Sequence, residues 1–167
     1  MLKIVSIIVL SILFVGCSTT KKPQVNKTSH KHKMFQSVNP KDATLTQSGK
    51  NKNSCAICGM NLTKFYKTSH TVVYENKNVQ YCSIHCLADH LEKGIEVKNP
   101  RVVDVTSLKF IPVLEAYYVV GSKVRGTMSR VSKYAFSSIE DAKKFQATYG
   151  GKIVDFNAAL EVAQEDF

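Results

Sequence analysis

Apolar and polar positions divide the chain into four segments. A mainly apolar run occupies residues 1–16, and residues 17–54 are almost entirely polar. Residues 55–110 and 111–167 alternate short apolar runs with polar turns. A segment as polar as 17–54 cannot bury enough apolar surface to order itself, so we expect a flexible basic tether there. The two later segments predict a folded head.

The first half of the head predicts a hairpin, a helix and a strand. Residues 69–74 and 79–82 carry β-branched and aromatic side chains on either side of an Asn-rich turn, which favours two antiparallel strands. Residues 84–93 have helical character and end at Gly94. Residues 101–105 form a Val-rich run after a proline, which predicts a further strand.

The same order returns in the second half. Residues 116–121 and 133–136 predict strands, and residues 138–149 predict a helix. Residues 152–156 predict the last strand, after which Asn157 is placed to cap a short terminal helix. We therefore expect an α+β head of two ββαβ units, an internal repeat in which neither half buries much surface alone.

The N-terminal segment predicts export. Residues 1–16 place Lys3 before an apolar run that is too short to span a bilayer, followed by small residues, as in a secretory signal peptide. Cys17 follows directly and resembles the lipidated cysteine of bacterial lipoproteins. The resemblance implies a lipoprotein anchored by Cys17 and facing the periplasm, and Ser18 favours the outer membrane. An ordinary signal peptide with an unmodified cysteine is the alternative.

Length and charge exclude several classes of protein. With 167 residues, the chain is too short for a large multidomain enzyme. Its 23 Lys and Arg against 13 Asp and Glu give a net charge of +10, which in a cytosolic protein would suggest nucleic acid. An exported protein has no nucleic-acid partner, so anionic lipid, an acidic protein or simple solubility explains the charge better.

Two closely spaced cysteine pairs are the main chemical signal. Cys55 and Cys58 form a CxxC motif, and Cys82 and Cys86 form a CxxxC motif where a predicted strand leads into a helix. Pairs of this spacing, folded next to each other, are typical of tetrahedral metal sites. Cu(I) accepts thiolates and thioethers in low coordination, whereas Zn(II) prefers four closed ligands. We expect Cu(I), with Zn(II) as the alternative.

Other residues are candidate ligands beside the cysteines. Met60 follows Cys58 across a glycine and can direct a thioether to the same ion. His70 opens the first strand, His85 lies on the predicted helix, and Met128 lies in a loop of the second unit. Each of these four residues could instead serve only for packing or as surface. Within the tether, His30, His32 and Met34 are weak candidates for metal capture, and polar filler is favoured there.

Three alternatives to a copper site stay open at this point. Thiols in an exported protein often pair, so two structural disulfides are one alternative. A structural or metal-sensing zinc module is the second. A thiol oxidoreductase is the third, but its CxxC motif opens a helix after a strand, whereas here Gly59 follows Cys58 at once. We therefore expect no enzymatic activity.

The head resembles the NosL-type lipoproteins, which are copper-binding accessory proteins for nitrous oxide reductase. The residues that carry the resemblance are Cys17, the stretch 55–60, His70 and the stretch 116–128, with further matches at 134–137, 140–142, Phe145 and 150–151. The resemblance implies paired ββαβ units and delivery of Cu(I) in the periplasm. Residues 81–86 depart from it and resemble the YHS or TRASH metal modules. Thr127 and Ser129 also depart, because Pro and Gly usually flank this methionine.

These observations predict a periplasmic Cu(I) metallochaperone that serves a copper enzyme of denitrification, nitrous oxide reductase. Cys58, Met60 and His70 are the preferred ligands, and Cys55, Cys82 and Cys86 are additional or alternative donors. The expected partners are the membrane, through the lipid, and the client enzyme, and a homodimer is also considered. The alternative is a zinc-stabilised structural or sensing module.

Overall fold

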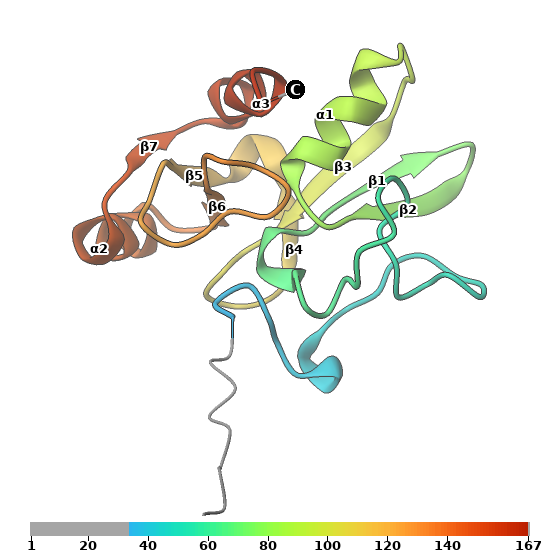
Figure 1. Cartoon of the computed structure of the whole chain (residues 1–167), viewed down its shortest axis with the longest axis horizontal. Coiled ribbons are helices and arrows are strands. Elements are labelled where there is room, and N and C mark those ends of the chain that lie inside the picture. The colour runs from blue at the N-terminus through green and yellow to red at the C-terminus, as the bar shows by residue number, and fades with distance from the viewer. Residues whose placement is uncertain (1–33, 167) are drawn as a thin grey trace, which may run out of the picture. The chain divides into compact units, whose positions relative to one another are not determined.

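A computed structural model describes residues 34–166 of the chain (Figure 1). The expected signal peptide, the lipidated Cys17, His30 and His32 lie outside the described residues. The described part combines helices with antiparallel sheets, so the α+β class is confirmed. None of its helices is long and apolar enough to cross a membrane.

The first half contains a four-stranded antiparallel sheet and one α-helix. Along the chain, its elements are β1 (His70–Tyr74), β2 (Lys77–Tyr81), α1 (Ile84–Glu92), β3 (Lys98–Val103) and β4 (Phe110–Pro112). The strands lie in the order β2-β1-β3-β4, so β1 is paired on both sides. The hairpin turn contains two residues, Glu75 and Asn76, and is shorter than the predicted turn of residues 75–78. Both residues adopt positive φ, as a tight two-residue turn requires.

The second half contains a three-stranded antiparallel sheet and two α-helices. Its elements are β5 (Tyr117–Val120), β6 (Lys133–Phe136), α2 (Ile139–Tyr149), β7 (Lys152–Val154) and α3 (Phe156–Gln164). The strand order β6-β5-β7 again places the first strand in the centre. Both halves therefore run strand, strand, helix, strand, as expected. That they form an internal repeat stays a prediction.

The second half differs from the prediction at its last helix. Asp155, not Asn157, caps α3, because its carboxylate accepts the Ala158 N–H at 2.9 Å. The helix α3 packs against α1 of the first half, and both lie toward the top of Figure 1. Apolar residues of both halves, including Leu87 and Ala159, consequently share one core.

The sheets are also joined through the backbone. Asp104, just after β3, forms an isolated parallel bridge with Ala135 of β6. The buried Asp104 carboxylate accepts the N–H groups of Ser107 at 2.9 Å and Ser137 at 3.2 Å. The two predicted units are thus parts of one folded body.

The prediction that the flexible tether continues to residue 54 was wrong. Residues 34–54 contact the head, although they carry little apolar periodicity. Gln36 is 4% exposed and donates to the Arg125 carbonyl at 2.6 Å. Thr46 donates its backbone N–H to Gln80 Oε1 at 2.9 Å, and Gln47 accepts the Gln80 N–H at 3.0 Å. The segment is ordered by these polar contacts and by a few isolated apolar residues, such as Phe35 and Leu45, that pack against the core, and neither forms a periodic hydrophobic pattern.

Candidate metal centre

The four predicted cysteine ligands lie together. Their sulfur atoms all lie within 4.8 Å of one another, and they are Cys55, Cys58, Cys82 and Cys86. The Cys58 and Cys82 sulfurs are 3.5 Å apart, and those of Cys82 and Cys86 are 3.7 Å apart. We call this group the cysteine cluster.

A tight turn and a helix start bring the cluster together. The Cys55 N–H donates to the Met60 carbonyl at 2.8 Å, and the Gly59 N–H donates to the Cys55 carbonyl at 3.0 Å. Gly59 has φ +73, a conformation that a residue without Cβ adopts at little cost. The Ala56 N–H donates to the Gln80 carbonyl at 3.0 Å, which fixes the turn against β2.

The sulfur spacing fits a metal ion rather than disulfides. In a tetrahedral site with metal–sulfur bonds of about 2.3 Å, neighbouring sulfurs are about 3.8 Å apart. A disulfide would need about 2.05 Å between two sulfurs. All four thiols of the cluster are free in the structure.

Hydrogen bonds between the thiols shift their pKa values in opposite directions. The bonds from Cys82 and then Cys86 hold the pKa of the Cys55 thiol well below its usual value. Its hydrogen bond to Cys55 raises the pKa of Cys82, and a separate hydrogen bond to Cys55 raises the pKa of Cys86. Cys55 is therefore a more acidic thiol than Cys82 and Cys86, and a bound cation would displace thiol protons.

The cluster is buried except on one side. Cys55, Cys82 and Cys86 are each 4% exposed or less, whereas Cys58 is half-buried. An ion could therefore enter or leave most directly at Cys58.

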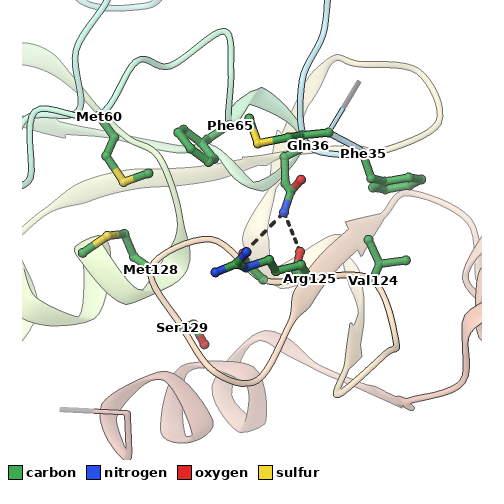
Figure 2. Close-up of a pocket in the computed structure, with 10 residues that line it drawn as sticks. Phe35, Gln36, Met60, Phe65, Val124, Arg125, Met128 and Ser129 are labelled. Carbon is green, nitrogen blue, oxygen red and sulfur yellow. Dashed lines mark hydrogen bonds between the residues drawn. The ribbon is translucent and has the colours of Figure 1, made fainter. Parts of the chain in front are cut away.

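A second group of sulfur atoms lines a neighbouring pocket of about 620 Å³. Met60 and Met128 approach this pocket from opposite sides, with Phe65 and Arg125 nearby (Figure 2). No cysteine of the cluster lines it. The predicted ligands Met60 and Met128 thus line a pocket to which no cysteine of the cluster contributes, and we call it the thioether pocket.

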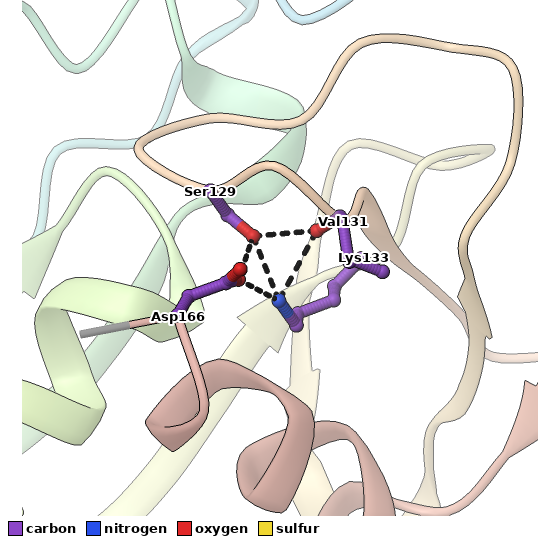
Figure 3. A network of polar contacts seen from close by, with 4 residues as sticks. All are labelled: Ser129, Val131, Lys133 and Asp166. Atoms are coloured by element: carbon purple, nitrogen blue, oxygen red, sulfur yellow. Dashed lines mark hydrogen bonds and ion pairs between the residues drawn. The ribbon is translucent and has the colours of Figure 1, made fainter.

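The loop that carries Met128 is held at both ends. Before Met128, Thr127 shares a hydrogen bond with the Thr68 hydroxyl at 2.9 Å, so the loop is fixed to the first half. After it, the Lys133 ammonium donates to Ser129 Oγ at 2.7 Å and pairs with Asp166 at 2.7 Å (Figure 3). Met128 itself adopts φ +56, a left-handed backbone conformation that is uncommon for residues other than glycine, asparagine and aspartate.

The structure does not bring His70 to the cysteine cluster. Its Nδ1 lies 3.0 Å from the Thr68 carbonyl, and its Nε2 lies 3.1 Å from the Tyr118 hydroxyl. Complete burial lowers the pKa of His70 to about 4, so the imidazole is neutral at neutral pH. The ring joins the two halves of the core instead of offering a nitrogen to the thiols. His85 lies on α1, half-buried, and is also outside the cluster.

The sequence analysis gave little weight to one methionine that lines the pocket. Met34 belongs to the segment expected to be tether, yet it lines the thioether pocket together with Met60 and Met128. A methionine followed by Phe35 in a polar stretch is a weak apolar signal, and only the folded chain shows what it contacts.

The mixed fold and the two sulfur groups define a small protein equipped for a soft metal ion. A family model described as NosL matches residues 46–163, which is most of the chain. The chain therefore belongs to the NosL family.

A solved relative agrees with this assignment. The chain is similar to the crystal structure of the copper chaperone NosL from Shewanella denitrificans, with 27% identity and a TM-score of 0.53. The match covers 67% of this chain and 94% of that chain. No curated protein matches the chain. NosL is a copper chaperone and not an enzyme, which confirms the non-enzymatic expectation.

Proposed function

We propose that this protein binds Cu(I) and transfers it to a copper enzyme. The observation that carries the proposal is the position of the half-buried Cys58, which belongs to the cysteine cluster and is two residues from Met60 of the thioether pocket. Thiolates and thioethers are both soft ligands that favour Cu(I). Their adjacency supports stepwise exchange of one ion between thiolate and thioether ligands.

Exposure also favours transfer over permanent storage. Met128 is 44% exposed, and the cysteine cluster reaches the surface on the side of Cys58. A closed four-coordinate site holds its ion, whereas a chaperone must present the ion to a partner. The copper ion is therefore cargo in this proposal.

The cellular role in the proposal is more specific. The chain acts as a lipoprotein anchored through Cys17, faces the periplasm, and supplies nitrous oxide reductase during denitrification. The pattern of residues 1–17 and the NosL family membership support this assignment.

An anaerobic titration tests the metal preference. The reduced full chain carrying Cys17→Ser is titrated with Cu(I) against a chromophoric Cu(I) chelator, with Zn(II) as competitor. We expect tight Cu(I) uptake that Zn(II) does not suppress. Met60→Leu should weaken Cu(I) binding about tenfold while leaving Zn(II) binding nearly unchanged. An equal loss for both metals would contradict the role of the Met60 thioether.

A resident zinc ion is the second candidate for the cysteine cluster. The sulfur separations of 3.5 and 3.7 Å are close to those of a tetrahedral tetrathiolate site. Retention of Zn(II) with weak Cu(I) binding in the same titration would favour this candidate and refute the copper proposal.

Transfer itself is tested with a client. Copper-loaded chain is mixed with metal-free nitrous oxide reductase, and the copper content of the enzyme is measured after separation. We expect faster loading than from an equal amount of Cu(I) held by a small-molecule chelator. Loading that is no faster would show that the protein stores copper without delivering it.

A further inference from the structure

Exposed cations surround the thioether pocket. The residues that line it fall in three stretches of chain, 34–36, 60–65 and 124–129, and none of these stretches contains Asp or Glu. Arg125 lies in the lining itself and is exposed (Figure 2). Three further exposed cations each adjoin a lining residue in the sequence, and they are Lys64, Lys123 and Arg130. We call these four cations the basic rim.

Carboxylates of the same chain do not neutralise the basic rim. Among the described residues, none of its four cations forms an ion pair. Asp166 contacts the lining residue Ser129, but its charge is paired with Lys133 at 2.7 Å. The side chains of that pair are 2% and 9% exposed, so they present little charge to a partner. The mouth of the pocket is therefore positively charged.

The centre of the same surface is apolar and partly exposed. Met34 is 43% exposed and Met128 is 44% exposed, while Phe35 and Phe65 are half-buried. Protein interfaces typically combine an apolar centre, enriched in aromatic residues and methionine, with a charged or polar rim. Methionine side chains are also flexible enough to adapt to the shape of a partner. The pocket and its rim have this composition.

The backbone around the pocket is held in place before any partner binds. The buried Gln36 side chain donates to the carbonyls of Arg125 at 2.6 Å and Gly126 at 3.3 Å. On the other side, the Lys67 N–H donates to the Gln36 carbonyl at 3.1 Å. A surface that is already ordered loses less conformational entropy on binding, which favours association.

We propose that the thioether pocket and the basic rim form the docking surface for a partner protein that presents an apolar side chain flanked by carboxylates. Charge complementarity supports this partner, because four exposed cations attract carboxylates and steer association. The cavity of about 620 Å³ accepts the apolar side chain. The proposal goes beyond the proposed function, because it concerns recognition of a partner and holds whichever metal the cysteine cluster binds.

The shape of the surface favours a protein over a membrane. Anionic lipid headgroups attract the same cations. However, a membrane-binding surface buries a continuous apolar face in the bilayer, whereas here the apolar side chains line a hollow. A second copy that docked through the same surface would place one basic rim against another, which like-charge repulsion opposes.

Methionine methyl NMR measures docking on the metal-free protein. The reduced full chain carrying Cys17→Ser is labelled with ¹³C-methyl methionine in non-ionic detergent. It is titrated with a short peptide that has Leu and Phe at its centre and Asp and Glu on both sides. The chain has four methionines, and Met1 serves as the internal reference. We expect saturable shifts of the Met34 and Met128 methyl signals, while that of Met1 stays in place.

Two comparisons isolate the charge of the peptide. In about 1 M NaCl, where the Debye length falls to about 3 Å, binding should weaken about tenfold or more. A peptide with Asn and Gln in place of Asp and Glu should bind about tenfold more weakly in low salt. Soluble short-chain phosphatidylglycerol, added in place of the peptide, provides the lipid comparison.

A triple variant and a matched control locate the charge on the protein. Three rim cations outside the pocket lining are replaced together, and the variant is Lys64→Gln, Lys123→Gln, Arg130→Gln. It should bind the acidic peptide about tenfold more weakly. The control replaces three exposed lysines that neither line the pocket nor adjoin a lining residue, and it is Lys98→Gln, Lys109→Gln, Lys152→Gln. It has the same net charge and should bind the peptide as the parent protein does.

The outcomes separate docking from copper binding. Methyl signals that do not move, or equal weakening by the two triple variants, would overturn the proposal. Equal binding of the neutral peptide would also overturn it. Shifts with phosphatidylglycerol but not with the peptide would assign the surface to a membrane, and shifts with protein concentration alone would assign it to a second copy. Because the titration uses metal-free protein, none of these results affects the Cu(I) proposal, and a failure of Cu(I) uptake would leave the docking surface standing.

Discussion

His70 shows how its surroundings decide the role of a single residue. Its position at the start of a strand, near four cysteines in sequence, favoured a metal ligand. In the fold, both ring nitrogens are engaged, with the Thr68 carbonyl and the Tyr118 hydroxyl, and the ring is buried. A buried base without a neighbouring anion remains neutral, since burial disfavours the charged form.

The lowered pKa of His70 predicts acid sensitivity. In the unfolded chain an imidazole is protonated below about pH 6.5, whereas in the folded chain the pKa of His70 is about 4. The unfolded state therefore binds an extra proton between these values, and stability is lost as the pH falls through that window. We expect a loss of about 3 kcal/mol that can be attributed to His70. Urea unfolding of the metal-free protein from pH 7.5 to 4 measures it.

The matched variant for this measurement is His70→Gln, which retains hydrogen-bonding groups but does not titrate. It should be less stable at pH 7.5 and show a smaller decline toward pH 4. Equal slopes for the two proteins would contradict the assignment, because other titrating groups would then account for the whole pH dependence.

At the scale of elements, the close approach of the Gly151 backbone to β5 determines how the last strand joins its sheet. Gly151 leads into β7, which pairs with β5. A Cβ at Gly151 would lie 2.7 Å from the Val120 carbonyl oxygen and 3.0 Å from a Val119 methyl group. A Cβ at the adjacent Gly150 would meet nothing within 4 Å. Both glycines have positive φ, but only Gly151 is crowded.

Paired substitutions at these glycines test the close approach. Gly150→Ala should cost about 1–3 kcal/mol of unfolding free energy from the backbone conformation alone, because its φ of 74 with ψ of −164 is essentially restricted to glycine. Gly151→Ala should cost about 1–3 kcal/mol more, since β7 must shift away from β5. Chemical denaturation of both variants provides the comparison. Equal losses would mean that the sheet accommodates the methyl group without cost.

At the scale of the whole molecule, a buried ion pair joins two positions of the second half that are far apart in the sequence. The Lys133 ammonium on β6 pairs with Asp166, near the end of the chain, and their side chains are 2% and 9% exposed. Ser129, next to Met128, takes part in the same network (Figure 3). One buried ion pair therefore connects the C-terminal region with the loop that lines the thioether pocket.

Removing the anion of this pair should affect both stability and the pocket. Asp166→Asn leaves Lys133 buried without its charge partner, and we expect a loss of about 2–4 kcal/mol in unfolding free energy. Asp89→Asn is the control, because Lys93 and Asp89 form a pair of the same 2.7 Å length on the surface. It should cost at most about 1 kcal/mol. Similar losses would show that burial adds nothing to the Lys133–Asp166 pair.

The order of the elements and the gathering of the four cysteines could be predicted from sequence, because both depend on local patterns. Strand alternation, helix periodicity and the CxxC and CxxxC spacings act over a few residues. The exceptions were local as well: Asp155 replaced Asn157 as a cap, and the hairpin turn was shorter. The cysteine ligands come from neighbouring elements, so their proximity follows from the hairpin and the helix start.

Only the tertiary structure decided how the remaining site residues are distributed. Met60 lines the thioether pocket, His70 joins the core through Tyr118, and Met34 lines the same pocket beside Gln36, which donates to the Arg125 carbonyl. Each placement depends on contacts between residues that are far apart in sequence. The strength of such contacts is set by burial and hydrogen-bond geometry, which exist only in the folded chain.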